Sequence, residues 1–128
     1  MAESRANYLT VTEFASLKLV AETVGDCFPD NYGVFHVGSS ITRKDYRDVD
    51  VRLIMADEAF ERLFGKTEAH PKNLDFWMLT CWAISEWMQK RTGLPIDFQI
   101  QAIGSADNKD KGPRNGLFFG RPSQTGEG

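Results

Sequence analysis

The sequence predicts an α/β (α+β) fold, in which helices pack on one face of a small mixed β-sheet. The first reason is that short apolar runs of strand length alternate along the chain with segments whose apolar residues recur at helical spacing. The second reason is the run from Ile96 to Ile103, where apolar and polar residues alternate from Ile96 to Gln101. Because side chains on a strand alternate between faces, this pattern indicates a sheet with one covered face and one open, polar face.

The length and composition fit one globular domain. The chain has 128 residues, of which 41% are hydrophobic and 26% are charged, so it can bury a core without a disulfide or metal. We assign the domain to residues 1–103 and expect a polar, flexible tail over residues 104–128. The net charge of -3 and the pI near 5.3 argue against general attraction to nucleic acid or to an anionic membrane. With no apolar stretch long enough to span a bilayer and no secretory signal, a cytoplasmic location is expected.

A capping box marks the start of the first predicted helix. Thr10 is placed to cap the backbone N–H of Glu13, and the Glu13 side chain can reach back to Thr10. Apolar residues at helical spacing then continue to residue 24. Gly25 is expected to end this helix, which covers residues 11–24.

The remaining elements follow from apolar runs and helical spacing bounded by turn residues. The predicted helix 74–91 is the most apolar, and its tryptophans are expected in the core (Trp77, Trp82 and Trp87). One helical turn fits near Ser40, between the first two strands. The predicted ranges are 33–37 for the first strand, 49–56 for the second strand, 57–64 for a short helix, 74–91 for the long helix and 96–103 for the third strand.

Three aspartates make a candidate metal site. Asp48 and Asp50 stand one residue apart at the start of the second strand, so their side chains point the same way. Two carboxylates held that close repel each other unless a cation or solvent relieves them. If the second and third strands are neighbours, Asp97 joins this pair from the polar face of the third strand. Such an oxygen-only ligand set favours Mg²⁺ or Mn²⁺ over zinc.

The turn after the first strand is suited to a phosphate. Gly38 permits close approach of the backbone, Ser39 offers a hydroxyl, and the N–H groups of a turn such as Gly38-Ser39-Ser40 can hold phosphate oxygens. Arg52 falls on the face of Asp50. There it either contacts a phosphate or pairs with a carboxylate.

This pattern resembles the nucleotidyltransferase superfamily with the polymerase-β-like fold. The family motif is an apolar strand, Gly-Ser, a connection, Asp-x-Asp in the next strand and a third acidic residue in a later strand. The resemblance covers residues 9–103 and is closest to minimal single-domain members, including those of bacterial toxin–antitoxin modules and phages. It implies transfer of a nucleotidyl group from a nucleoside triphosphate, such as ATP, to a hydroxyl on a small molecule, a protein or RNA.

The resemblance also implies roles for the site residues. Asp48 and Asp50 would bind two Mg²⁺ (or Mn²⁺) ions, and Asp97 would bind the catalytic ion and help to activate the acceptor. These three would be the catalytic residues. The predicted nucleotide-binding residues are Gly38, Ser39, Ser40 and Arg52.

Two features leave a second interpretation open. The connection from Ser40 to Arg47 contains no glycine and is slightly short for the family, and the sequence shows no second domain for a base or a large acceptor. The alternative is a non-catalytic module of the same fold that binds a partner protein or a nucleotide. The tryptophan-rich helix also leaves room for a homo-oligomer or a partner chain.

Overall fold

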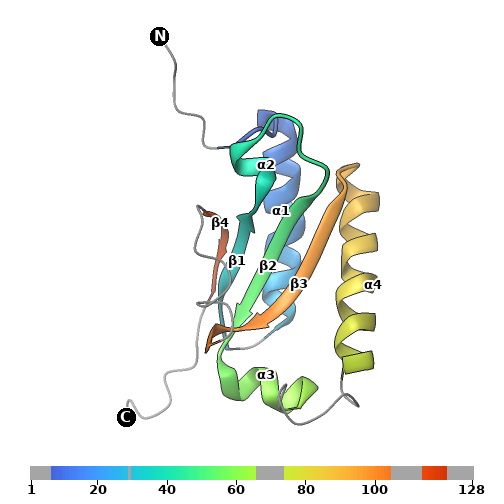
Figure 1. Ribbon diagram of the computed structural model, residues 1–128. Helices are drawn as coiled ribbons and strands as arrows, with labels where there is room; N and C mark the ends of the chain where they lie inside the picture. Colours follow the sequence, from blue (N-terminus) through green and yellow to red (C-terminus); the bar gives the residue numbers. More distant parts are fainter. Residues whose placement is uncertain (1–6, 29, 66–73, 105–113, 121–128) are drawn as a thin grey trace.

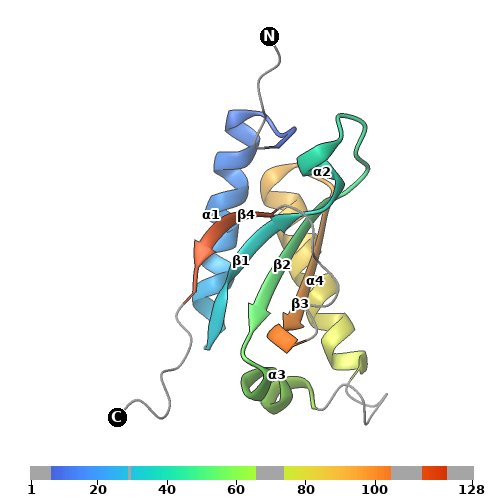
Figure 2. The ribbon, with the colours of Figure 1, turned by 60° about the vertical axis from the view of Figure 1, so that its left-hand side comes forward.

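The computed structural model describes residues 7–28, 30–65, 74–104 and 114–120. These residues form a mixed four-stranded sheet with helices packed against it, which confirms the predicted fold class (Figure 1). Helices α1 and α4 lie side by side on one face of the sheet, whereas α2 and α3 lie at its two ends (Figure 2). The elements are α1 (Val11–Cys27), β1 (Asn31–Val37), α2 (Ser39–Thr42), β2 (Val49–Met55), α3 (Asp57–Phe64), α4 (Leu74–Thr92), β3 (Ile96–Ala102) and β4 (Arg114–Phe119).

The strand order is β3-β2-β1-β4. Strand β1 runs antiparallel to β2 and β4, and β2 runs parallel to β3. The second and third strands are therefore neighbours, as the grouping of the aspartates requires. The predicted boundaries of β2, α3, α4 and β3 agree with the structure to within one residue, and β1 begins two residues earlier than predicted.

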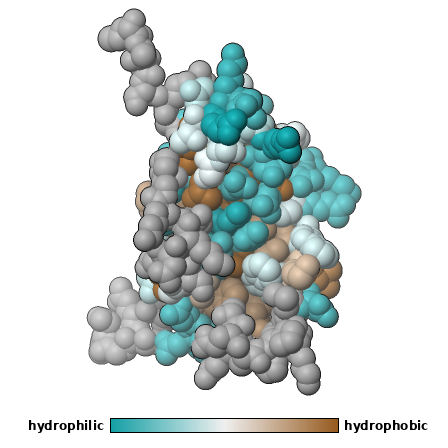
Figure 3. All heavy atoms as spheres, viewed as in Figure 1, coloured by the Kyte–Doolittle hydropathy of each residue, from teal (hydrophilic) through white to brown (hydrophobic). Residues whose placement is uncertain are grey.

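The two faces of the sheet differ in chemistry. The face toward α1 and α4 is apolar and packs with the buried sides of these helices, because alternate residues of each strand point into the core. Hydrophilic side chains gather on the other face over β2 and β3 (Figure 3). The core is built mainly from Leu17, Val20, Ala21, Val24, Val34, Val49, Val51, Leu53, Met55, Met88, Ile96, Phe98 and Ile100.

Helix α1 starts as predicted and ends later. The backbone N–H of Glu13 donates to Thr10 Oγ1 at 3.1 Å, and the N–H of Thr10 donates to Glu13 Oε1 at 2.8 Å, which completes the capping box. Gly25 does not end the helix, which continues to Cys27. Its missing side chain serves packing instead, since a Cβ on Gly25 would overlap the ring of Phe118.

The expected tail contains a strand, so the domain boundary at residue 103 is wrong. Residues Arg114–Phe119 pair with β1 as β4, and Leu117 is buried with the core. Residues 105–113 and 121–128 of the expected tail lie outside the described residues.

The outer side of α4 corrects a second expectation. Trp82 is 63% exposed rather than part of the core, and Phe76 and Leu79 are exposed beside it. Trp77 and Trp87 do pack against the core, and the indole N–H of Trp77 donates to the carbonyl of Ile100 at 2.8 Å. The sheet covers only one side of this helix, so its apolar outer side stays in solvent. Across the described ranges, no helix is both long and apolar enough to cross a membrane.

Candidate functional site

Asp50 and Asp97 lie directly opposite each other in the paired parallel strands β2 and β3. Neighbouring strands are about 4.8 Å apart, so the two side chains rise side by side from the polar face. The Asp50 side chain is 23% exposed and that of Asp97 is 46% exposed, so a solute can reach both. The predicted proximity of these two carboxylates is confirmed.

Gly38 connects the turn after β1 with this pair of carboxylates. It has a φ of +84°, which favours glycine, and an added Cβ would overlap the Asp50 carboxylate. The backbone of the turn therefore lies against the Asp50 side chain, with no side chain of its own between them. The turn predicted to hold phosphate and the acidic pair predicted to hold metal consequently form one site.

Asp48 is placed differently from its two predicted partners. It lies just before β2 and is exposed. The next residue, Val49, begins the strand, and its N–H donates to the carbonyl of Pro95, just before β3, at 2.9 Å. Among the described residues, no group of three His, Cys, Asp or Glu side chains is arranged to hold a metal ion. The structure thus brings two of the three predicted ligands together, and the metal assignment remains a prediction.

Arg52 occupies the space beside the two carboxylates. Its Nη2 lies 4.0 Å from Asp50 Oδ1 and 3.8 Å from Asp97 Oδ2, which is ion-pair distance but too long for a hydrogen bond. Its Nη1 donates to the carbonyls of Val51 at 3.0 Å and Asp97 at 2.8 Å. The backbone therefore holds the guanidinium beside the two carboxylates, and its charge partly neutralises theirs. The Arg52 side chain is only 12% exposed. This arrangement matches carboxylate pairing, one of the two roles predicted for Arg52.

Ser40 faces the core and not a ligand. It is fully buried, its Oγ lies 2.5 Å from His36 Nε2, and its carbonyl accepts from the N–H of Tyr8 at 2.9 Å. A direct nucleotide contact by the Ser40 side chain would need this bond to open, whereas Ser39 is half-buried and closer to solvent. Ser40 therefore stabilises the turn from its buried side through these two hydrogen bonds.

His36 is a buried neighbour of the turn that the sequence did not link to it. It is fully buried on the covered face of β1, because it alternates with Phe35 and Val37. Burial lowers the pKa of His36 from 6.5 to about 4, so the imidazole is neutral near pH 7. Its spacing of four residues from Ser40, across a strand end and a tight turn, is the signal that could have linked the two.

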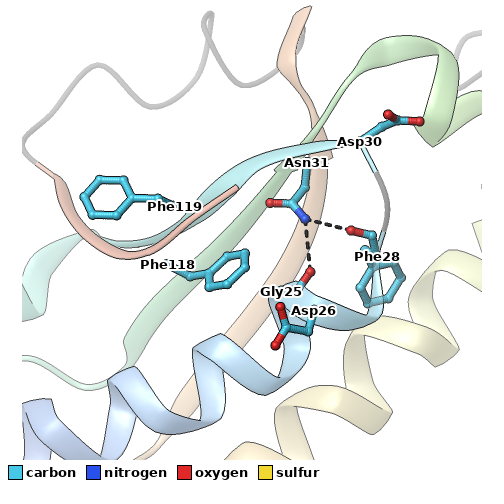
Figure 4. A pocket seen from close by; sticks show the side chains of 7 residues that line it. All are labelled: Gly25, Asp26, Phe28, Asp30, Asn31, Phe118 and Phe119. Carbon is cyan, nitrogen blue, oxygen red and sulfur yellow. Dashed lines mark hydrogen bonds between the residues drawn. The ribbon is translucent and has the colours of Figure 1, made fainter. Parts of the chain in front are cut away.

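A hollow separate from this site lies at the other end of β1 from Gly38 (Figure 4). It has a volume of about 270 Å³, and the amide nitrogen of Asn31 donates there to the carbonyls of Gly25 at 3.1 Å and Phe28 at 2.7 Å. Asp30 is already paired with Arg62 at 3.2 Å. These bonds join the end of α1 to the start of β1, and none of the predicted site residues lines this hollow. The lining residues are Gly25, Asp26, Phe28, Asp30, Asn31, Phe118 and Phe119.

Comparison of the chain with protein-family models, curated proteins and solved structures finds no match.

Proposed function

We propose that the chain is a Mg²⁺-dependent nucleotidyltransferase that moves a nucleotidyl group from a nucleoside triphosphate to a hydroxyl acceptor. One observation carries this proposal: the glycine turn after β1 packs against Asp50, and Asp97 stands opposite Asp50 in the next strand. A reaction of this kind needs a place where phosphate oxygens and metal-binding carboxylates meet, and these three residues supply one. The order of elements from α1 to β3 also agrees with the order on which the resemblance was based.

The donor set suits Mg²⁺. This ion binds oxygen and commonly takes one or two carboxylates, completing its shell with water and substrate phosphates. Asp50 and Asp97 would be the two carboxylates, and exposed Asp48, close by in the chain, would add a third oxygen ligand. When bound, Mg²⁺ would neutralise charge on the triphosphate and make an acceptor hydroxyl easier to deprotonate. Asp97 is the more exposed of the paired carboxylates, which makes it the better placed to receive a hydrogen bond from that hydroxyl.

Arg52 acts on this site by holding the carboxylates. Its bonds to two backbone carbonyls fix the guanidinium, so its positive charge offsets part of the repulsion between Asp50 and Asp97. Direct contact between Arg52 and the nucleotide remains a prediction. The hydroxyl acceptor and a partner chain also remain predictions.

Transfer assays with substitutions of the two aspartates test the proposal. The chain would be incubated with each labelled nucleoside triphosphate, Mg²⁺ or Mn²⁺, and candidate acceptors, while pyrophosphate release is followed. Asp50→Asn and Asp97→Asn should each abolish transfer, because each removes a charged metal ligand. Asp26→Asn, at an exposed position on α1, makes the same chemical change outside the site and should leave transfer unchanged. Full transfer by Asp50→Asn protein would refute the proposal.

A non-catalytic module of the same fold is the second candidate function. It is favoured by Arg52, which already neutralises part of the charge of the acidic pair, and by the lack of a third converging ligand among the described residues. Such a module would bind a nucleotide or a protein without a metal. Titration with Mn²⁺ separates the candidates, since only the enzyme should show metal binding that is lost in both Asp50→Asn and Asp97→Asn proteins.

A further inference from the structure

Arg114 lies in the same row of the sheet as the two carboxylates. The row crosses all four strands, because Asp97 pairs with Asp50, Asp50 with Val37, and Val37 with Arg114. Residues paired in this way point to the same face, so Arg114 belongs to the polar face although it comes from β4, in the stretch predicted to be a tail. With strands about 4.8 Å apart, its Cα is about 10 Å from that of Asp50.

The Arg114 side chain leans inward over this face. Its guanidinium carbon lies 5.4 Å from the centre of the Phe35 ring, and Phe35 pairs with Arg52 in the adjacent row. Cation–π contact of this kind directs the charge from the β4 edge toward the middle of the sheet. The position is exposed, so a solute can reach the guanidinium.

Only Val37 separates Arg114 from the carboxylates along this row. Val37 is buried at 5% exposure, and Gly38, the next residue, has no side chain. An extended chain of phosphates can therefore lie beside the exposed backbone of Gly38. One end of it would meet Asp50 and Asp97, and the other end would meet Arg114.

We propose that Arg114 binds the polyphosphate of a nucleoside triphosphate at the end remote from the carboxylates. This inference rests on the proposed function for its ligand and goes beyond it by adding a residue of β4 to the site. Arg52 is placed for a different role, because its Nη1 donates to backbone carbonyls beside the acidic pair. A guanidinium suits the task, since its fixed fork of N–H donors matches phosphate oxygens.

The test measures binding of inorganic tripolyphosphate and of each nucleoside triphosphate by calorimetry, in EDTA and in Mg²⁺. Arg114→Gln should weaken tripolyphosphate and nucleotide binding about tenfold in the Mg²⁺ buffer, because a charged hydrogen-bond donor is lost. Arg114→Lys should recover part of the affinity by restoring the charge without the fork. Arg62→Gln is the matched control: it removes the same charge from α3, near the opposite end of β1, and should change neither affinity.

The outcomes separate this inference from the function on which it rests. If the wild-type chain binds nucleotide with Mg²⁺ and Arg114→Gln binds it equally well, the role of Arg114 is refuted and the nucleotidyltransferase proposal stands. Should Arg114→Gln weaken nucleotide but leave tripolyphosphate unaffected, Arg114 contacts the base or the sugar, and the inference is wrong as stated. If the wild-type chain binds none of the triphosphates in either buffer, both proposals fail.

Discussion

Protonation of His36 should destabilise the fold at mildly acidic pH. The buried imidazole has a pKa of about 4, against 6.5 for an ordinary histidine, so the native state resists a proton that the unfolded chain takes up. This contribution to stability is complete above pH 6.5 and is lost as the pH falls from 6.5 toward 4. At pH 5 the two pKa values give a loss of about 2 kcal/mol relative to pH 8.

Urea unfolding at pH 8 and pH 5 measures this loss. His36→Gln is the reference variant, because glutamine keeps a polar group near Ser40 Oγ and does not titrate. The other histidine, His70, and all the carboxylates are present in both proteins, so their effects cancel in the comparison. The wild-type chain should lose about 2 kcal/mol more than the variant between the two pH values. Equal losses would show that His36 is not held neutral by burial, and the reasoning about its environment would be wrong.

Three further substitutions probe the turn, the added strand and the acidic pair. Gly38→Ala should cost about 1–3 kcal/mol in urea unfolding, because it adds an overlap with Asp50 to a strained φ, whereas Gly93→Ala has open space and should cost less. Leu117→Ala should lower the free energy of unfolding by about 2–5 kcal/mol, because its side chain is buried in the core. Phe119→Ala, at 88% exposure, should have almost no effect. Equal losses in the two variants would contradict the packing of β4. Arg52→Gln should lower the melting temperature, because the two carboxylates are left without their neighbouring cation. Mg²⁺ should then raise the melting temperature more in this variant than in the wild-type chain. If Mg²⁺ has no larger effect on the variant, the result argues against a metal site.

The sequence predicted those parts of the fold that local patterns determine. Alternation in β3 and the two apolar runs before it placed three strands, and helical spacing placed α1, α3 and α4. The same alternation assigned Asp50, Arg52 and Asp97 to one polar face, and the structure confirms that these residues are neighbours. Periodicity was sufficient here because each strand has one buried face.

The errors arose where long-range packing overrides a local signal. Strand β4 carries Gly116 and begins in a polar stretch, so nothing in its own pattern reveals its pairing with β1. Gly25 would normally end a helix, but the ring of Phe118 from that same strand packs where a side chain would stand. Trp82 was expected in the core because α4 is apolar on several sides, yet a sheet of four strands covers only one of them.

The site was predicted less completely than the fold for a related reason. The spacing of Asp48, Asp50 and Asp97 along the chain predicted one acidic cluster, but register places only Asp50 and Asp97 opposite each other. The buried hydrogen bond between His36 and Ser40 depends on the conformation of the turn after β1. The periodicity of the sequence does not predict that conformation.

The most direct test of the central claim is calorimetric titration of the wild-type chain with non-hydrolysable nucleoside triphosphates, with and without Mg²⁺. If Gly38, Asp50 and Asp97 form a metal-dependent nucleotide site, at least one triphosphate should bind only with Mg²⁺. That binding should disappear in Asp50→Asn and Asp97→Asn proteins and persist in Asp26→Asn protein. Binding that is absent for every triphosphate, or that survives unchanged in Asp50→Asn protein, would contradict the claim.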